Sequence, residues 1–168
     1  KAAASGLPMV VDADALNIIA DGRVVRDIPR DNWILTPHPG EAARLLGVTG
    51  AALQADRFAA VAQLQQRYGG VTVLKGSGTL VAGAQRPPGV CPYGNPGMAS
   101  GGMGDVLSGV SGSLLAQGLA LQDAARAAVC IHSRAADLAA ADQGERGLCA
   151  TDLIPWIRRL VNPGRAGV

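Results

Sequence analysis

Short apolar runs that alternate with helix-like segments constrain the fold of this chain more than any other feature. The apolar runs at residues 7–13 and 31–41 end in carboxylates or in a proline-rich turn, and a segment with helical spacing follows each of them. Strands alternating with helices are typical of an α/β domain, in which helices cover a sheet. Ligands of such domains bind beyond the carboxyl ends of the strands, so the residues that follow each strand are the ones to examine for chemistry.

The middle of the chain continues this alternation. Residues 54–70 predict an amphipathic helix with Phe58 and Val61 near one face and two glycines at its end. Residues 71–83 predict a strand, a glycine-containing turn and a second strand. No linker-like segment divides the chain, so residues 1–168 are expected to form one domain.

Three more helices are predicted toward the end of the chain, the last of them at residues 152–162. Residues 105–118 space their apolar side chains like a helix, and Gly109 and Gly112 inside it would permit close packing on the sheet. Residues 121–144 predict a long alanine-rich helix.

Composition excludes several classes of protein. Of 168 residues, 48% are hydrophobic and 17% are charged, which suits a folded globular domain and argues against disorder. The net charge is +2 and the aromatic residues are one Phe, two Tyr and two Trp, a poor endowment for binding nucleic acid. No apolar run approaches the ~18 residues of a membrane span, so no membrane partner is expected.

The cysteines and the start of the chain carry further expectations. Cys91, Cys130 and Cys149 are odd in number and form no CxxC pair, so neither a metal cluster nor a disulfide framework is expected. No signal peptide is visible, and a reducing cytoplasm is the expected location. The chain starts without Met and reaches a strand-like run almost at once, so it is expected to be the C-terminal part of a longer protein.

The segment NPGMASGGMGDVLSG, residues 95–109, places five glycines around one carboxylate, Asp105. The backbone N–H groups of residues 101–104 can point at one spot where a helix also begins, which predicts an anion hole suited to phosphate. Asp105 beside a bound phosphate could accept a proton from an attacking hydroxyl. A glycine-rich turn with an ordinary aspartate at the helix start explains the same pattern equally well.

Two further turns carry candidate side chains. His38 and Glu41 lie three residues apart in TPHPGE, where the imidazole could bond a substrate and the carboxylate could hold magnesium through water. A surface turn with Glu41 capping the helix is the alternative. In KGSGT, residues 75–79, a lysine, two glycines and two hydroxyls suit the phosphates and sugar of a nucleotide, and a plain hairpin turn is the alternative.

Weaker candidates lie outside these turns. Asp12 and Asp14 follow the first strand and could line the site, although capping of the next helix explains them equally well. His132 and Cys130 lie in the long helix, where a structural role is expected for His132 and buried packing for Cys130.

Four stretches that occur in this order together resemble one family. VVDADALN, LTPHPGEAARLLG, VLKGSGT and GNPGMASGGMGDVLSG are similar to the nucleotide-dependent NAD(P)H-hydrate dehydratases of the ribokinase-like superfamily. The resemblance covers residues 7–163. It implies a three-layer α/β/α fold with a mostly parallel central sheet, here lacking its N-terminal part, and it identifies the chain as the carbohydrate-kinase-related C-terminal portion of such a domain.

The resemblance implies a repair reaction. A nucleotide, ADP or ATP, would phosphorylate the ring hydroxyl of the S epimer of hydrated NADH or NADPH, and departure of phosphate would restore NAD(P)H; with ADP the other product is AMP. Magnesium is the implied cofactor. The resemblance further implies a cytoplasmic hydro-lyase that forms a homo-oligomer, with an epimerase domain upstream in many bacterial relatives.

The resemblance also implies roles for individual residues. Asp105, in a match to the superfamily's GxGD, would be the catalytic base and would contact the hydrate together with His38. Glu41 would help to place magnesium through water. The nucleotide would be bound by Lys75, Gly76, Ser77, Gly78, Thr79 and Gly104, and the anion hole would comprise Gly101, Gly102, Met103 and Gly104.

Two alternatives stay open. A small-molecule kinase of the same superfamily, such as a hydroxyethylthiazole kinase, shares GxGD and the anion hole. The residues of the PHPGE and NPGMASGGMGD motifs nevertheless favour the dehydratase. An inactive nucleotide-binding fragment is the second alternative, because family members carry an earlier section that supplies strands and part of the hydrate pocket.

Overall fold

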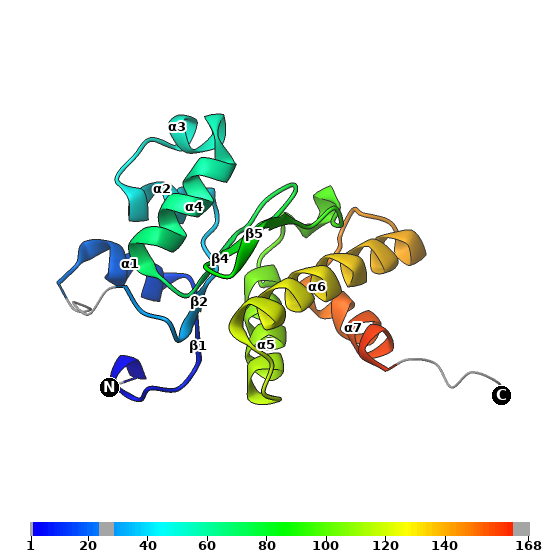
Figure 1. The fold of residues 1–168 in the computed structure, drawn as a ribbon. Coiled ribbons are helices and arrows are strands. Elements are labelled where there is room, and N and C mark those ends of the chain that lie inside the picture. Colours follow the sequence, from blue (N-terminus) through cyan, green and yellow to red (C-terminus); the bar gives the residue numbers. More distant parts are fainter. Residues whose placement is uncertain (1, 24–28, 163–168) are drawn as a thin grey trace.

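Helices cover both faces of one five-stranded sheet in the computed structural model, which describes residues 2–23 and 29–162 (Figure 1). The strands are β1 (Met9–Val11), β2 (Trp33–Leu35), β3 (Val71–Leu74), β4 (Leu80–Gly83) and β5 (Arg86–Val90). The helices are α1 (Asp14–Asp21), α2 (Pro39–Leu46), α3 (Gly50–Ala55), α4 (Arg57–Tyr68), α5 (Met103–Ala116), α6 (Leu121–Gln143) and α7 (Leu153–Val161). Short 3-10 helices lie at Ala2–Ala4, Pro96–Met98 and Ala150–Asp152. The predicted α/β class is confirmed.

The sheet is mixed, and its strands are hydrogen bonded in chain order. β1, β2 and β3 run parallel, with Val10 opposite Ile34 and Ile34 opposite Val71. β4 runs antiparallel to β3, because the glycine turn at residues 75–79 folds the chain straight back as a hairpin, and β5 runs antiparallel to β4. The expectation of a mostly parallel sheet therefore holds for β1 to β3, and the carboxyl ends of these three strands lie at one edge.

Alternate residues of the strands build two separate cores, which gives the three layers. In β2, Trp33 and Leu35 face a core shared with α1 to α4, whereas Ile34 faces a core shared with α5 and α6. Thus the side chains of a single strand reach both helix layers, as the period of two in a strand requires. A third, smaller cluster joins the start of α5 to α6 and α7.

The predicted single helix at residues 54–70 is two helices. The chain breaks at Asp56, whose side chain accepts a hydrogen bond from the Ala59 N–H and so caps α4. Phe58, expected on the buried face, is 53% exposed, because it lies about 100° around α4 from the face formed by Val61 and Leu64.

The two glycines inside α5 do not serve close packing on the sheet. A Cβ atom added to Gly109 or to Gly112 would meet no heavy atom within 4 Å. The expectation that they let α5 approach the sheet is wrong. Small residues allow close packing in α6 instead, where Ala124, Ala125 and Ala128 are fully buried in the core that this helix shares with the sheet.

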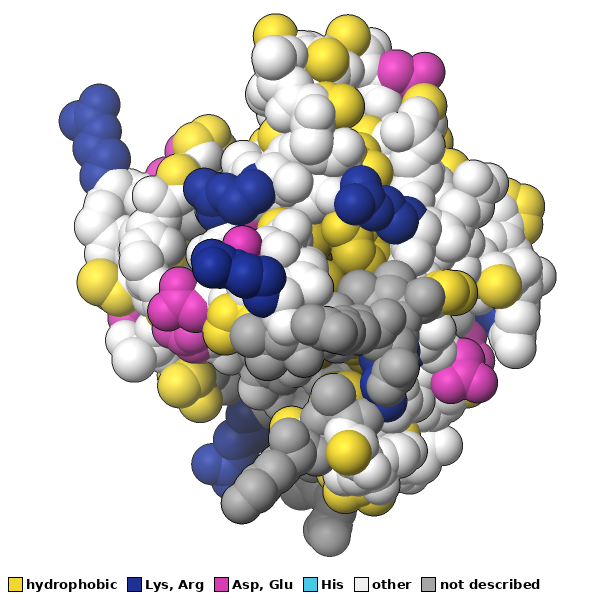
Figure 2. Space-filling model, turned by 90° about the vertical axis from the view of Figure 1, so that its left-hand side faces the viewer, with side chains coloured by type: hydrophobic (Ala, Val, Ile, Leu, Met, Phe, Trp, Pro, Cys, Tyr) yellow, Lys and Arg dark blue, Asp and Glu magenta, His cyan; other side chains and the backbone are white. Residues whose placement is uncertain are grey.

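The molecular surface seen in Figure 2 carries Lys and Arg side chains that are interspersed with Asp, Glu and apolar side chains and do not merge into one continuous basic patch. This mixture agrees with the formal net charge of +2. In the described ranges, no helix combines the length and the hydropathy needed to cross a membrane.

Gly70, between α4 and β3, is expected to tolerate no side chain. Its φ is +56°, and a Cβ atom would overlap the Trp33 carbonyl oxygen and crowd the indole ring. Gly70→Ala should lower the free energy of unfolding by about 3 kcal/mol or more, because backbone strain and steric overlap add together. Urea unfolding of the purified variant measures this loss.

Gly47→Ala is the matched control. Gly47 also has a positive φ, +71°, but a Cβ atom there would meet nothing within 4 Å. Gly47→Ala should lower the free energy of unfolding by about 1 kcal/mol, from backbone strain alone. Equal losses in the two variants would show that the contact with Trp33 is not what constrains Gly70.

Candidate active site

The carboxyl ends of the three parallel strands meet at one ammonium group. Lys75 follows β3, and its Nζ lies 2.9 Å from Oδ1 of Asp12, which follows β1. The same Nζ lies 4.0 Å from Oε2 of Glu41, in the helix that follows β2. The three side chains are 22%, 17% and 8% exposed, so this is a largely desolvated charge cluster. We call these three residues the Lys75 junction.

Asp12 also connects the junction to two helices. Its Oδ1 accepts a hydrogen bond from the Ala13 N–H at 2.9 Å, and its Oδ2 accepts one from the Ser108 hydroxyl of α5 at 3.3 Å. Ala13 has φ 51°, which is uncommon for a residue with a side chain and marks local strain beside the site. Asp14, the other candidate here, is exposed at the start of α1.

His38 and Glu41 form a reciprocal cap at the start of α2. The His38 Nδ1 accepts hydrogen bonds from the backbone N–H groups of Gly40 at 3.0 Å and Glu41 at 3.3 Å, and Oε2 of Glu41 accepts one from the His38 N–H at 2.8 Å. The capping alternative is therefore correct, yet it does not remove either residue from the site. The His38 side chain is 57% exposed, and its Nε2 lies 3.5 Å from Oε1 of Glu41. Because Nδ1 accepts, Nε2 is the ring nitrogen that is available as a donor.

The glycine-rich segment brings the start of α5 to the Lys75 junction. Gly102, with φ 84°, precedes the helix, and no side chain caps its first turn. A Cβ atom on Gly104 would lie 3.2 Å from Oδ2 of Asp12 and 3.5 Å from Nζ of Lys75. Positive potential from the helix start therefore adds to the charge of Lys75 at this point.

The other predicted residues of this segment lie further out. Gly101, Gly102 and Asp105 are exposed, and Asp105 occupies the first turn of α5, one residue beyond Gly104. None of the three lines the cavity described next.

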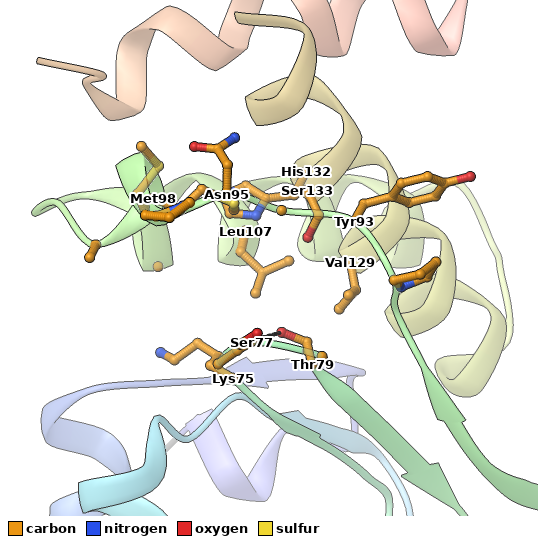
Figure 3. Close-up of a pocket in the computed structure, with 18 residues that line it drawn as sticks. Lys75, Ser77, Thr79, Tyr93, Asn95, Met98, Leu107, Val129, His132 and Ser133 are labelled. Atoms are coloured by element: carbon orange, nitrogen blue, oxygen red, sulfur yellow. Dashed lines mark hydrogen bonds between the residues drawn. The ribbon is translucent and has the colours of Figure 1, made fainter. Parts of the chain in front are cut away.

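A cavity of about 420 Å³ opens between the hairpin turn and the helices (Figure 3). The turn at residues 75–79 forms one wall, with Lys75, Ser77 and Thr79 facing the gap. The opposite wall includes Tyr93, Asn95, Met98, Leu107, Val129, His132 and Ser133. The structure thus brings the predicted nucleotide residues Lys75, Gly76, Ser77, Gly78, Thr79 and Gly104 to one cavity. Glu41 does not line that cavity but belongs to the Lys75 junction, and His38 contacts Glu41.

The wall that contains Asn95 is held from α6. The Asp137 carboxylate accepts hydrogen bonds from the Gly94 N–H at 3.1 Å and from the Asn95 side-chain amide at 3.0 Å. Oδ1 of Asn95 in turn accepts a hydrogen bond from the Gly97 N–H at 3.1 Å. Asn95 is therefore rigidly oriented before any ligand arrives.

Sequence reasoning did not place His132 in the site. The ring lines the cavity and is 5% exposed. The pKa of His132 is lowered to about 4, chiefly by burial; a hydrogen bond to the backbone of Met103 opposes the shift and the charge of Lys75 contributes to it. A usable signal was present, because residues 125, 128, 129, 132, 135 and 136 are buried with helical spacing and His132 continues that face.

Hard oxygen donors for magnesium are available at the Lys75 junction. Within the described ranges no group of three or more His, Cys, Asp or Glu residues could hold a metal ion. Mg²⁺ commonly binds through one or two carboxylates, with waters and substrate phosphates completing its coordination. The carboxylates of Glu41 and Asp12, beside the predicted phosphate position, fit an ion held jointly with a nucleotide.

The comparisons with known proteins agree on one family. A family model described as NAD(P)H-hydrate dehydratase matches residues 1–159. The bifunctional NAD(P)H-hydrate repair enzyme Nnr of Coxiella burnetii is 56% identical over 163 residues, covering 97% of this chain and 33% of that enzyme. The ADP-dependent (S)-NAD(P)H-hydrate dehydratase of Neisseria meningitidis is 48% identical over 158 residues, covering 92% of this chain and 53% of that enzyme. The chain thus spans a third to about half of these relatives.

A solved structure shows the same fold. The ADP/ATP-dependent NAD(P)H-hydrate dehydratase of Bacillus subtilis, co-crystallised with ATP and Mg²⁺, superposes with a TM-score of 0.76 at 34% sequence identity. The match covers 92% of this chain and 54% of that one. The predicted ribokinase-like architecture is therefore confirmed.

Burial of His132 should make stability depend on pH. The unfolded histidine binds a proton below its ordinary pKa of 6.5, whereas the folded ring stays neutral down to about 4. Between these two pH values the unfolded state binds more protons than the folded state. The stability contributed by His132 is therefore fully present above pH 6.5 and is lost as the pH falls toward 4. Wild-type protein should lose about 3 kcal/mol of unfolding free energy over this window that His132→Gln does not lose.

Urea unfolding at several pH values measures the difference between the two proteins. Ser133→Ala is the control, because it alters a buried neighbour on α6 without changing proton binding, and it should keep the wild-type pH dependence. A wild-type pH dependence in His132→Gln would contradict the assignment of a buried neutral ring.

Proposed function

Because the chain belongs to the NAD(P)H-hydrate dehydratase family, we propose that it carries out the nucleotide-dependent dehydration of the S epimer of hydrated NADH or NADPH. The hydroxyl of the hydrated ring takes the terminal phosphoryl group of ADP or ATP. The phosphate ester then loses phosphate as a ring proton departs, which restores the double bond of the nicotinamide. With ADP the products are NAD(P)H, AMP and phosphate, and the reaction repairs a damaged cofactor.

The observation that carries this proposal is the meeting of Lys75, Gly104 and the turn at residues 75–79 at one cavity. Lys75 and the start of α5 supply positive potential where phosphates would lie. The N–H groups of residues 101–104 would stabilise charge on the transferring phosphoryl group. Nucleotide contacts are assigned to Lys75 through Thr79 and to Gly104.

The hydrated ring is assigned to the side where His38 and Asp105 are exposed. The Nε2–H of His38 would donate a hydrogen bond to the hydrate. Asp105, in the first turn of α5, would accept the proton of the attacking hydroxyl. The two residues would thus orient and activate the same small molecule.

Magnesium is assigned to the Lys75 junction. Glu41 would hold it through water, and Asp12 lies on the other side of Lys75 with a second carboxylate. When bound, the ion would neutralise charge on the transferring phosphoryl group. The bifunctional relatives support the proposal of an upstream epimerase domain in the whole protein. A cytoplasmic location and assembly as a homo-oligomer are proposed from the family resemblance alone.

A small-molecule kinase is the second candidate, because phosphoryl transfer to a hydroxyl uses the same base and anion hole. The two activities separate by product. The dehydratase restores the NADH absorbance band from hydrated NADH in the presence of ADP and magnesium, whereas the kinase yields a stable phosphate ester of a thiazole alcohol. An inactive fragment would do neither, although it would still bind nucleotide.

Asp105→Asn should lose several orders of magnitude in the rate of dehydration, because the amide cannot accept the hydroxyl proton. ADP affinity should stay within a few-fold of wild type, since Asp105 does not line the cavity. Recovery of NADH absorbance measures the rate, and calorimetry measures ADP binding. Asp123→Asn, an exposed carboxylate on α6 paired with Arg86, is the control and should keep full activity. Near-normal turnover of Asp105→Asn would remove it from the role of base.

Gly104→Ala should weaken ADP binding about tenfold or more. Its Cβ atom would occupy the space within 3.2 Å of Asp12 and 3.5 Å of Lys75, where a phosphate is assigned. Gly109→Ala, in the same helix with open space at its Cβ, should bind ADP normally and gain about 1 kcal/mol of stability. Unchanged ADP affinity in Gly104→Ala would place the phosphates elsewhere.

A further inference from the structure

A guanidinium group lies behind the turn at residues 75–79. Arg57, the first residue of α4, donates from Nη1 to the Ser77 carbonyl at 2.5 Å. Its Nη2 lies 3.4 Å from the carbonyl oxygens of both Leu74 and Lys75. Arg57 does not itself line the cavity, although the turn that it contacts forms one of the cavity walls.

These contacts fix the direction of the peptide planes in the turn. In a planar trans peptide, the carbonyl and the following N–H point in opposite directions. Because the carbonyls of Lys75 and Ser77 point toward Arg57, the N–H groups of Gly76 and Gly78 point away from it, and both glycines line the cavity. Gly76 and Gly78 have φ of 136° and 64°, which residues with side chains rarely adopt.

The two N–H groups are left without acceptors. In the part of the chain that the structure describes, neither the Gly76 nor the Gly78 N–H donates a hydrogen bond to backbone or side chain. Successive N–H groups directed at one spot form a concave anion site. The turn therefore presents a pair of backbone donors to whatever occupies the cavity.

The charge of Arg57 is not balanced by a neighbouring acid. No Asp or Glu of residues 2–23 or 29–162 lies within ion-pair distance of it, and its Nε is buried without a hydrogen-bond partner. A partly buried cation without a counter-ion favours the arrival of an anion nearby. The same side chain thus orients the turn and adds positive potential behind it.

We propose that Arg57 is a positioning residue of the nucleotide site, which aims the N–H groups of Gly76 and Gly78 at phosphate oxygens of bound ADP. This inference rests on the proposed assignment of the cavity to a nucleotide. It adds a residue from the opposite layer of the fold, behind the sheet, that touches no substrate and acts through the backbone it holds.

The test combines affinity with a spectroscopic readout. In ¹⁵N-glycine-labelled wild-type protein, the amide resonances of Gly76 and Gly78 should shift on addition of ADP. Arg57→Met should abolish these shifts and weaken ADP binding about tenfold or more. Arg67→Met is the control, because Arg67 lies on the same helix with its guanidinium 5.3 Å from the Tyr68 ring centroid and does not contact the turn. It should leave both readouts unchanged.

Arg57→Lys keeps the test decisive if Arg57→Met does not fold. Lysine retains the charge and the aliphatic stem but not the forked donors, so the variant should fold and still bind ADP several-fold more weakly. Wild-type ADP affinity in either folded variant would overturn the proposal, as would unperturbed Gly76 and Gly78 amides in wild type that binds ADP. Failure of wild type to bind ADP at all would instead overturn the nucleotide assignment itself, and this inference with it.

Discussion

The contact between the Lys75 ammonium and the Asp12 carboxylate is the interaction on which the rest of the site depends. Both groups are largely withdrawn from water, and neither could be left there alone without a cost of several kcal/mol. The parallel register of β1 to β3 is what places the two residues, together with Glu41, at one edge of the sheet. Through Ser108 the same cluster also fixes the start of α5. Strand pairing, helix placement and charge pairing therefore support one arrangement.

Much of the assigned chemistry belongs to the backbone rather than to side chains. Gly104 lets the start of α5 approach Lys75 and Asp12 closely, and the proposal for Arg57 directs the N–H groups of Gly76 and Gly78 at the cavity. Side chains such as Arg57 and Asp137 act from outside the cavity by holding carbonyl or amide groups of its walls. This division explains why most of the sequence positions that mark the site are glycines, whose role is conformational, and only a few are charged residues.

The sequence predicted the parts of the fold that local rules decide. The hairpin at residues 71–83, the alternation of strands and helices, and the meeting of residues after β1, β2 and β3 follow from turn chemistry and from the edge rule for parallel strands. The break at Asp56 and the exposure of Phe58 were missed because they depend on where α4 meets the sheet, not on its own periodicity. The places of His132 and Arg57 at the site were not predicted for the same reason, because each contacts an element that is far away in the chain.

The charge balance of the site limits how a nucleotide can bind. Lys75 and Arg57 carry two positive charges and Asp12 and Glu41 carry two negative ones, although no acid of the described ranges pairs directly with Arg57. The unliganded site therefore has almost no net charge with which to attract a diphosphate. Asp105, at the start of α5, makes the local sum more negative. Helix and turn N–H groups stabilise an anion but do not cancel its charge. A divalent cation would supply the missing charge, and the carboxylates of Asp12 and Glu41 are the hard oxygen donors that such an ion prefers.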